Sequence, residues 1–419
     1  MLDSSSRTGI TSPRILEAER QATLLPPFVR SLFPGVTNQV HLNMAEGGLL
    51  PQPTAEAAHA YVEETVSGLG DKSEHRASVE RCREGLARLI GADADEVAVT
   101  KNVSEGLNLF ASSLPWKSGD NVVLCPELEH PNNVFLWYNL HRLKGIEVRA
   151  VEPDDGRVPV DAMAAAMDGR TVLVTVPHVS FSPGFITDVA AVSNAAHACG
   201  SLLLVDAAQS LGAIRCNVDE LGIDALAVAT QKALLGFYGL GFLYVRRALA
   251  ESIIPAHVAR YGMDLGTDAG ETARSGGEQL PYAPGARRFD LGNYNYLGAT
   301  VAEASLELIA SIGVDRIEAH LRTLAATLVE GLRELGLPVA GGPPGPHLGH
   351  IVAVGLSGGG HHDTADDPAM NDLYQHLTAH GVNLSIRKGV LRMSLGLYND
   401  LSDVTRTLEL VREWVEATR

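Results

Sequence analysis

Three short apolar runs between residues 202 and 245 predict three strands of a buried sheet. Leu202–Val205, Ala225–Ala229 and Phe242–Val245 are each bounded by small or polar residues. Continuous apolar runs of this length are typical of strands that are buried on both faces. Asp206 follows the first run, and Lys232 comes shortly after the second. Because ligands of open α/β sheets bind beyond the carboxyl ends of the strands, we expect Asp206 and Lys232 to lie close together.

Strand-like and helix-like patterns alternate along the rest of the chain, which favours an α/β fold. Before residue 202 the expected elements are a helix at 78–90, a strand–turn–helix unit at 96–114, a second such unit at 121–137, and strands at 147–151 and 172–177. After residue 245 they are helices at 300–312, 315–335 and 372–380, with strands in the segments HIVAVGLS and VLRMSLGLYND.

The length of 419 residues exceeds what one hydrophobic core usually holds. We expect an N-terminal arm at 1–36, a large domain at 37–298 and a smaller C-terminal domain at 299–419, on which part of the N-terminal segment packs. Apolar residues make up 45% and charged residues 20%, as in ordinary soluble enzymes. The net charge of −17 argues against binding to nucleic acid or to an anionic membrane surface.

The cysteines and the first residues indicate a cytoplasmic protein. Cys82, Cys125, Cys199 and Cys216 are widely spaced and form no CxxC pair, which predicts reduced thiols without a metal framework. The opening segment MLDSSSRTGITSP lacks the apolar core of a secretory signal, and no apolar run approaches the length of a membrane span. The segment GGGHHDTADDP could offer metal ligands, but no partner motif follows, so we expect a solvated loop and no metal.

A carboxylate and a lysine at neighbouring strand ends suit pyridoxal 5'-phosphate (PLP). The amine of Lys232 would form a Schiff base with the cofactor aldehyde, and Asp206 would pair with the protonated pyridine nitrogen so that the ring remains an electron sink. An isolated aspartate and lysine would more often be a loop cap and a solvated side chain. The surrounding segments VDAAQSLG, TQKALLG and GLGFLYV favour the cofactor instead.

These segments resemble the class V aminotransferase family of fold type I PLP-dependent enzymes, which includes cysteine desulfurases, selenocysteine lyases, kynureninases and isopenicillin N epimerase. The resemblance runs from about His41 to the C-terminus. It implies a large domain with a mostly parallel mixed sheet flanked by helices, and a smaller C-terminal α+β domain. It also implies catalytic roles for Lys232, Asp206 and His130. His130, in the EH-x-N segment, matches the family histidine that stacks on the pyridine ring and assists proton transfer.

The resemblance places the cofactor phosphate at the turn before the helix that opens near Ser104. Val103 and Ser104 would bind it through backbone N–H groups and the serine hydroxyl, since a helix N-terminus favours anions. Taken alone, Ser104 followed by Glu105 would be only a helix cap.

The family segment Ser-x-His-Lys appears here as Ala229, Thr230, Gln231 and Lys232. Gln231 can still donate to the phosphate through its amide, and Thr230 is expected to compensate for Ala229. Gln209 matches the family residue that hydrogen-bonds the ring hydroxyl.

Two further positions depart from the desulfurase pattern. Phe181 stands where cysteine desulfurases place an asparagine against the ring hydroxyl, so that contact is either lost or taken over, with Ser180 and Ser182 as the candidates. Asn293, in RRFDLGNYNYLGA, stands where the family usually has a threonine that reaches the neighbouring subunit's phosphate. The resemblance therefore implies a homodimer with shared active sites. Residues 261–285 have little periodicity and are expected to form a mobile loop near the site.

The substrate end of the site contains two arginines. Arg392, in LRMSLGLYND, matches the family arginine that binds the α-carboxylate, which a planar guanidinium grips through two parallel hydrogen bonds. Arg387 is a second candidate. Cysteine desulfurases carry a catalytic cysteine on a loop between two such arginines, but here only KGVL separates them. Because a persulfide route needs that thiolate, the sequence argues against it.

The sequence predicts a PLP-dependent enzyme that acts on an amino-acid substrate through an external aldimine, with the released Lys232 as general base. We favour a C–S β-lyase acting on a cysteine S-conjugate. Decarboxylation coupled to deamination, epimerisation and transamination stay open as alternatives. A non-enzymatic PLP-fold binding or scaffold protein is the remaining alternative. Retention of Lys232, Asp206 and Arg392 argues against it.

Overall fold

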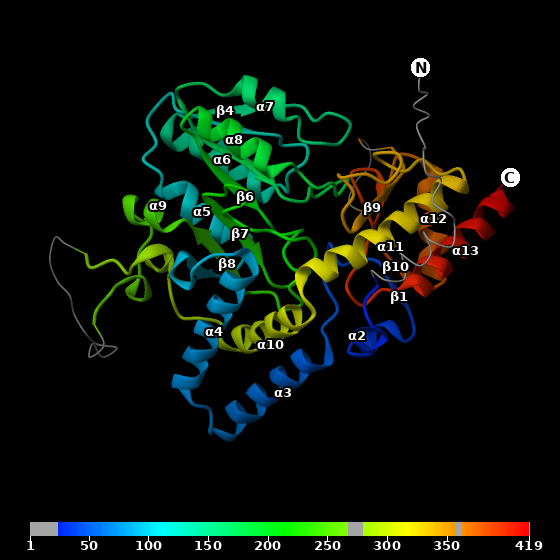
Figure 1. The fold of residues 1–419 in the computed structure, drawn as a ribbon, viewed down its shortest axis with the longest axis horizontal. Helices are drawn as coiled ribbons and strands as arrows, with labels where there is room; N and C mark the ends of the chain where they lie inside the picture. The colour runs from blue at the N-terminus through cyan, green and yellow to red at the C-terminus, as the bar shows by residue number, and fades with distance from the viewer. Residues whose placement is uncertain (1–23, 267–279, 357, 359–362, 419) are drawn as a thin grey trace, which may run out of the picture.

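The computed structural model describes residues 24–266, 280–356, 358 and 363–418. Its larger lobe is built on a seven-stranded sheet and its smaller lobe contains the C-terminal helices (Figure 1). Residues 1–23 of the predicted N-terminal arm, the two histidines of the GGGHHDTADDP segment and residues 267–279 of the predicted mobile loop lie outside the described residues.

The large sheet is mixed but mostly parallel, as predicted. Only β8 runs antiparallel to both of its neighbours. In spatial order the strands are β2 (Val97–Thr100), β8 (Gly241–Val245), β7 (Ala225–Ala229), β6 (Leu202–Asp206), β5 (Thr171–Pro177), β3 (Asn121–Leu124) and β4 (Glu147–Ala150). The three apolar runs between residues 202 and 245 therefore form the adjacent strands β6, β7 and β8.

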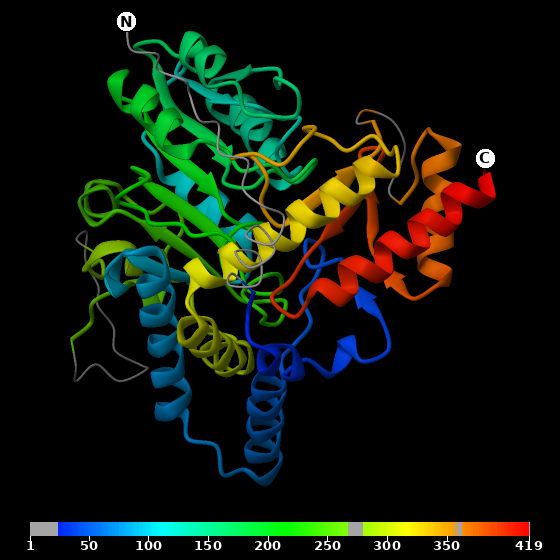
Figure 2. The same cartoon turned by 45° about the vertical axis from the view of Figure 1, so that its right-hand side comes forward.

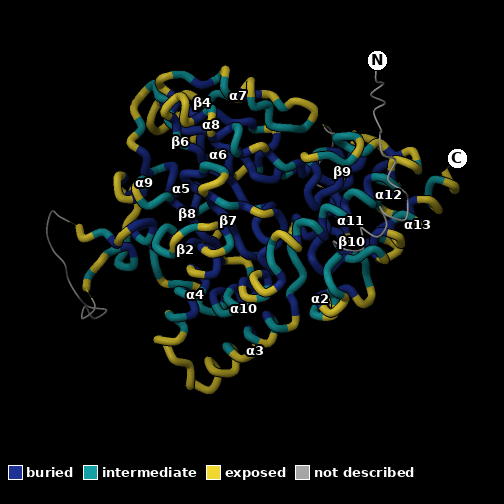
Figure 3. The backbone as a smooth tube through the Cα atoms, in the orientation of Figure 1, coloured by how far each residue is buried: buried dark blue, intermediate teal, exposed yellow. Residues whose placement is uncertain are grey.

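Both faces of the sheet are covered, which explains why its strands are apolar throughout. On one face lie α5 (Val103–Ser113) and α6 (Asn132–Lys144), whose Phe110 and Trp137 pack on Leu204 and Ala227. On the other lie α7 (Val160–Ala166) and α8 (Val189–Ala198), in contact with β3, β5 and β6. Figure 3 shows the buried residues concentrated in this central layer.

Helices lie along the lower edge of the large lobe in Figure 1. Helix α10 (Tyr296–Ile312) packs against α3 (Gln52–Ser67) and α4 (Lys72–Ile90). Short elements complete the lobe: 3-10 turns η2 (Ala94–Glu96), η3 (Arg260–Gly262) and η4 (Gly285–Phe289), and helix α9 (Arg247–Ser252).

Several helices begin earlier than the apolar pattern predicted because polar residues cap them. Helix α4 was expected from residue 78 but begins at Lys72, where the Asp71 carboxylate accepts from the Ser73 N–H at 2.8 Å. Helix α10 was expected from residue 300, but the Asn295 side chain caps it by accepting from the Gly298 N–H at 2.9 Å. The first turn of α4 is largely exposed and carries no apolar periodicity, so only its cap marks the start. The first turn of α10 is partly buried, and the Asn295 cap marks its start.

The smaller lobe contains a three-stranded antiparallel sheet in the order β11 (Ser385–Arg387), β12 (Val390–Ser394) and β9 (Ile351–Val354). Its helices are α11 (Val314–Glu334), α12 (Pro368–Ala379) and α13 (Leu401–Thr418), and α11 and α13 lie side by side (Figure 2). Near the N-terminus, β1 (Val40–His41) pairs in parallel with β10 (Val382–Asn383) of this lobe. The domain boundaries at 36/37 and 298/299 stay predictions.

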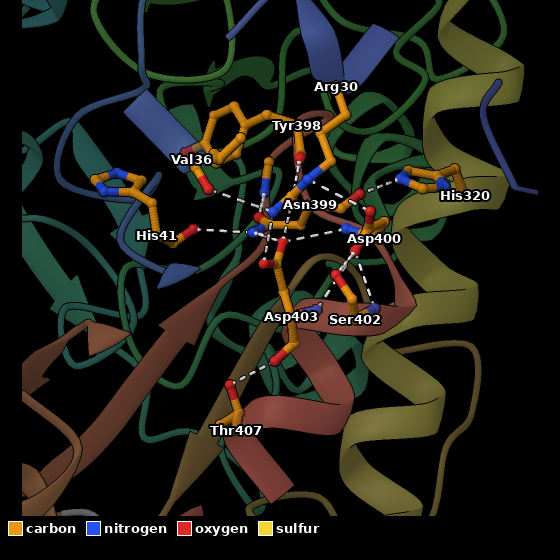
Figure 4. Close-up of polar contacts among 11 residues, drawn as sticks. Arg30, Val36, His41, His320, Tyr398, Asn399, Asp400, Ser402, Asp403 and Thr407 are labelled. Carbon is orange, nitrogen blue, oxygen red and sulfur yellow. Dashed lines mark hydrogen bonds and ion pairs between the residues drawn. The ribbon is translucent and has the colours of Figure 1, made fainter. Parts of the chain in front are cut away.

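The turn after β12 is held by a buried polar network that joins the N-terminal arm to the small lobe (Figure 4). Helix α2 (Pro27–Ser31) contributes Arg30, which donates to Asp403 at 2.6 Å and to the Tyr398 carbonyl at 2.7 Å. The Asn399 amide donates to the same Asp403 carboxylate at 2.8 Å, and a ring nitrogen of His320 lies 2.9 Å from the Asn399 carbonyl. The 3-10 turn η1 (Pro34–Val36) follows α2. This network fixes the end of the strand that carries Arg392.

No single helix among the described residues is long and apolar enough to cross a membrane. The pair α10 and α11 passes that test only when taken together, and it is bent by 78°.

A buried ion pair attaches η4 and the start of α10 to the sheet edge. Arg83 on α4 is 0% exposed and donates to Asp290 at 2.8 Å. The same carboxylate accepts from the Val99 N–H of β2 at 2.8 Å and from the Tyr294 hydroxyl at 2.7 Å. Asp290 therefore satisfies three donors that no water can reach.

We expect Asp290→Ala to destabilise the protein by about 3–5 kcal/mol, because it removes the buried carboxylate that Arg83 binds and leaves the enclosed charge with the more exposed Glu80, 3.4 Å from its Nε. The midpoint of urea unfolding, followed by circular dichroism, measures this loss. As a control, Glu409→Gln removes the exposed pair between Glu409 and Arg406, and should cost less than about 1 kcal/mol. Equal shifts for the two variants would contradict the expectation.

Candidate active site

A cavity of about 190 Å³ opens at the carboxyl ends of the central strands. Strands β5, β6 and β7 end at its wall, in agreement with the position expected for a ligand in this type of sheet. Seven of the predicted site residues line it: Val103, Ser104, His130, Asp206, Gln209, Gln231 and Lys232.

Asp206 and Lys232 meet in this cavity, as predicted. Asp206 is the last residue of β6 and its carboxylate accepts from the Ala208 N–H at 2.9 Å. Burial raises the pKa of Asp206, while the Ala208 N–H and the Lys232 charge oppose that shift. Burial also lowers the pKa of Lys232 to about 8, although the Asp206 charge acts in the opposite direction. A substantial fraction of Lys232 is therefore an uncharged, nucleophilic amine near neutral pH.

The turn before α5 is arranged to receive an anion. Asn102 caps this helix by accepting from the Glu105 N–H at 2.9 Å, so the N–H groups of Val103 and Ser104 lie at the free end of the helix. The Asn132 amide donates to the Ser104 hydroxyl oxygen at 2.7 Å. Because that oxygen is already an acceptor, the hydroxyl proton of Ser104 is available to a ligand.

His130 is uncharged at neutral pH. Burial lowers its pKa to about 4, and the Lys232 and Arg392 charges add to the effect. Its Nδ1 accepts from the Asn132 N–H at 3.2 Å, so the ring proton is carried by Nε2. The ring of Phe181 lies edge-on to the imidazole, with 5.0 Å between the ring centroids, and restricts how it can turn.

Two glutamine side chains present buried atoms without a hydrogen-bond partner in the described part of the chain. They are Oε1 of Gln209 and Oε1 of Gln231, and both residues line the cavity. The Gln209 amide nitrogen donates to the Ala45 carbonyl at 3.1 Å. The Gln209 atom left to face a ring hydroxyl is therefore an acceptor, and the hydroxyl would be the donor.

The structure does not bring Thr230 to the cavity. Its hydroxyl donates to the Phe237 carbonyl at 2.7 Å, so it cannot compensate for Ala229 at a phosphate as expected. The same holds for the two serines beside Phe181. Ser180 Oγ accepts from the Gly184 and Phe185 N–H groups, both at 3.0 Å, and Ser182 Oγ faces the Arg387 carbonyl. Neither serine is among the residues that line the described cavity, which favours the alternative that the ring-hydroxyl contact is lost.

Arg387 and Arg392 differ in their ion-pair partners. Arg387 forms ion pairs with Asp363 and, at 3.4 Å, with Glu46. Arg392 is 1% exposed and donates to the Phe181 carbonyl at 3.0 Å, and its guanidinium lies 5.0 Å from the centroid of the Phe181 ring. Its Nε has no hydrogen-bond partner among the residues described. Burial and the Arg387 charge lower the pKa of Arg392 to about 10, which leaves it cationic at neutral pH.

A tight turn explains why no cysteine-bearing loop lies between these arginines. Arg387 on β11 pairs with Val390 on β12, so only Lys388 and Gly389 connect the strands. Their φ angles are +49° and +79°, and a two-residue hairpin with positive φ at both central positions is a type I′ turn. None of the four cysteines, all within the described residues, lines the cavity.

Asn293 does not reach the cavity of its own chain. It is exposed, and its side-chain oxygen accepts from the Tyr261 hydroxyl at 2.8 Å. A role at a neighbouring subunit's phosphate stays a prediction.

Sequence reasoning missed several residues of the cavity wall, chiefly Glu46, Asn102, Glu129 and Tyr238. The signal for Glu129 was present, because it stands directly before His130 in the EH-x-N segment. Asn102 could have been identified as the cap of the predicted helix. Glu46 and Tyr238 come from segments that only the folded chain brings together, where the Tyr238 hydroxyl lies 3.3 Å from the Glu46 carbonyl.

These features fit PLP: a lysine with a lowered pKa, a carboxylate for the pyridine nitrogen, a helix N-terminus for the phosphate and partnerless amide oxygens facing the same space. Together with the mixed α/β sheet they define a fold type I PLP-dependent enzyme. The comparisons with known proteins agree. The sequence model of the family described as Aminotransferase class-V matches residues 48–407, and the chain belongs to this family.

Three relatives illustrate the range of this likeness. An uncharacterized aminotransferase, YcbU, of Bacillus subtilis is 31% identical over 385 residues, which cover 92% of this chain and 97% of the relative. A probable cysteine desulfurase of Methanothermobacter thermautotrophicus is 30% identical, with the same coverage. The apo structure of a cysteine desulfurase from Thermococcus onnurineus superposes with a TM-score of 0.80 at 27% identity, covering 94% of this chain and 98% of the other.

The lowered pKa of Lys232 leads to a pH prediction. Only the neutral amine attacks the cofactor aldehyde, so covalent capture of PLP by the apoprotein should accelerate as the pH rises through about 8 and then level off. Stopped-flow absorbance in the visible range measures this rate. Lys232→Ala should show no covalent addition by mass spectrometry after borohydride reduction. A midpoint near 10, the value of an ordinary lysine, would contradict the prediction.

Proposed function

We propose that this PLP-dependent enzyme is a C–S β-lyase that acts on a cysteine S-conjugate and releases a thiol, pyruvate and ammonia without an enzyme persulfide. The single observation that carries the proposal is the two-residue turn between Arg387 and Arg392, which leaves no loop for a catalytic thiolate. Cys125 and Cys216 are buried, and burial raises the thiol pKa of each to about 12, so neither supplies a thiolate from the core at neutral pH.

In this proposal the bound PLP acts as the electron sink, and the chain's own residues bind the substrate and move the proton. Arg392 receives the α-carboxylate through its partnerless edge and, held by Phe181, orients the substrate so that the Cα–H bond faces Lys232. The Lys232 amine then removes that proton as general base. The Asp206 carboxylate would balance the positive charge of the protonated pyridine nitrogen. Elimination needs only one base, which Lys232 would supply, and a thiolate that leaves from Cβ, which the proposed substrate would supply.

The protonation state of His130 favours elimination over epimerisation. An epimerase needs an acid on the face opposite to Lys232, which His130 would have to supply. With its pKa near 4, His130 is neutral at physiological pH and is a poor proton donor. We therefore assign it to stacking on the cofactor ring, where a neutral imidazole held by Asn132 and Phe181 fits.

The test is a product assay on the purified holoenzyme with S-alkyl cysteine. Pyruvate and thiol should form in equal amounts, and alkylation of accessible thiols with iodoacetamide should leave the rate unchanged, as should Cys199→Ser at the exposed cysteine. Alanine with sulfane sulfur, or loss of activity on alkylation, would overturn the proposal in favour of a persulfide route. Aldehyde, keto acid without thiol, or racemised substrate would indicate the decarboxylating, transaminating or epimerising alternative.

The unequal pairing of the arginines gives a second prediction. Arg392→Gln should lower kcat/KM by about a hundredfold, because a charge-assisted pair of hydrogen bonds to the carboxylate costs about 3 kcal/mol to lose. Arg387→Gln should lower it less than about tenfold, since Asp363 and Glu46 already occupy that guanidinium. Steady-state kinetics on both variants measure the difference. Equal effects would show that the two arginines share the carboxylate.

An amino-acid substrate, a homodimer in which Asn293 reaches the neighbouring phosphate, and a cytoplasmic location complete the proposal. The exposure of Asn293 and its distance from the described cavity of its own chain support the second of these points.

A further inference from the structure

Glu129 is the one glutamate fully enclosed in the cavity wall. It follows β3, is 1% exposed and lines the same cavity as Asp206 and Lys232. Neither of its carboxyl oxygens has a hydrogen-bond partner among the residues that the structure describes. A buried carboxylate without donors is strongly unfavourable, so the side chain must either be neutral or receive donors from a ligand.

Asp206 differs from Glu129 in its partners. Its carboxylate accepts from the Ala208 N–H at 2.9 Å and lies near the Lys232 charge. Two carboxyl groups enclosed in one low-dielectric cavity do not both ionise, because each charge opposes the other. The proton goes to the group with fewer donors. Burial, reinforced by the Asp206 charge, raises the pKa of Glu129 well above its usual value, although the Asn133 side chain acts in the opposite direction.

The other titratable groups around this end of the cavity do not reverse the assignment. Lys232, from the turn after β7, and Arg392, on β12, carry the nearby positive charges, and both act on His130. His130 itself is neutral. Cys125, behind Glu129 at the end of β3, stays a thiol because burial raises its pKa. The Lys232 charge favours ionisation of Asp206, the group on which it acts most directly.

We propose that Glu129 is a positioning residue that stays a neutral carboxylic acid, so that Asp206 alone carries the negative charge beneath the pyridine nitrogen. As a neutral acid Glu129 can donate a hydrogen bond inside the cavity, which a carboxylate cannot do. No acceptor among the described residues lies within hydrogen-bond distance of Glu129, so this donor would serve a bound ligand. The inference rests on the proposed role of Asp206 in the cofactor site.

The direct test is infrared spectroscopy of protein labelled with ¹³C-glutamate, as apoprotein and as holoenzyme at pH 8. We expect a protonated-carboxyl band that shifts with the glutamate label, disappears in Glu129→Gln and persists in Glu127→Gln. Glu127 lies two residues away on the same loop, but it is exposed and paired with Lys388 at 3.3 Å, which makes it a matched control. A band that does not respond to the glutamate label would place the proton on Asp206, and absence of any such band would mean both groups are ionised. Either result overturns the proposal.

A pH titration of the holoenzyme's visible spectrum gives an independent readout. Gln replaces a neutral acid with a neutral amide, so Glu129→Gln should move the midpoint by less than about one pH unit. Removal of a true negative charge would destabilise the nearby cation and lower the midpoint by more than that. Glu129→Leu, which cannot donate, should retain the cofactor about fivefold less well than Glu129→Gln, the loss of one hydrogen bond. Equal retention would refute the positioning role.

The two proposals fail in different ways. A wild-type protein that never binds PLP covalently would refute the proposed cofactor site, while the infrared band of the apoprotein would still report on Glu129. A yellow, active holoenzyme without a protonated glutamate would refute only the inference about Glu129.

Discussion

The site depends on one constraint, the enclosure of opposite charges at a single edge of a doubly covered sheet. Strands β6 and β7 run parallel, so they deliver Asp206 and Lys232 to the same edge. Helices on both faces exclude water from the strands, and the low dielectric that results changes the chemistry of each group. The pKa of the Lys232 amine falls, the imidazole of His130 becomes neutral, and the second carboxyl group, Glu129, is proposed to stay protonated. The reactive state of the site therefore follows from burial more than from any single contact.

Charge is distributed unevenly over the cavity, and this distribution separates the roles of similar residues. Arg387 is neutralised by Asp363 and Glu46, whereas the Arg392 Nε has no hydrogen-bond partner among the described residues. Among the acids, Asp206 accepts from a backbone N–H, and neither oxygen of Glu129 has a hydrogen-bond partner in the described part of the chain. Within each pair the two residues carry the same kind of ionisable group. Their hydrogen-bond and ion-pair partners distinguish the roles that we propose for them.

Phe181 connects the two halves of the site. Its ring meets the edge of His130, and both its ring and its carbonyl contact Arg392. Where cysteine desulfurases are expected to have an asparagine, this chain has an aromatic side chain that contacts both His130 and Arg392, the residues proposed to stack on the cofactor ring and to bind the carboxylate. The short hairpin after Arg387 is a second difference from cysteine desulfurases, because its two-residue connection leaves no loop that could carry a thiol.

The sequence by itself determined the α/β sheet, the Asp206–Lys232 pair, the cofactor and the family, since apolar runs and the residues at their ends are local features. It placed the starts of α4 and α10 too late, because the Asp71 and Asn295 caps mark those starts. Only the tertiary structure decided that Thr230, Ser180 and Ser182 turn away from the cavity and that Glu129 is enclosed in it. The reason is that a side chain's hydrogen-bond partners and its access to water depend on segments that are distant in the chain. These two factors determine where the side chain points and whether it is charged.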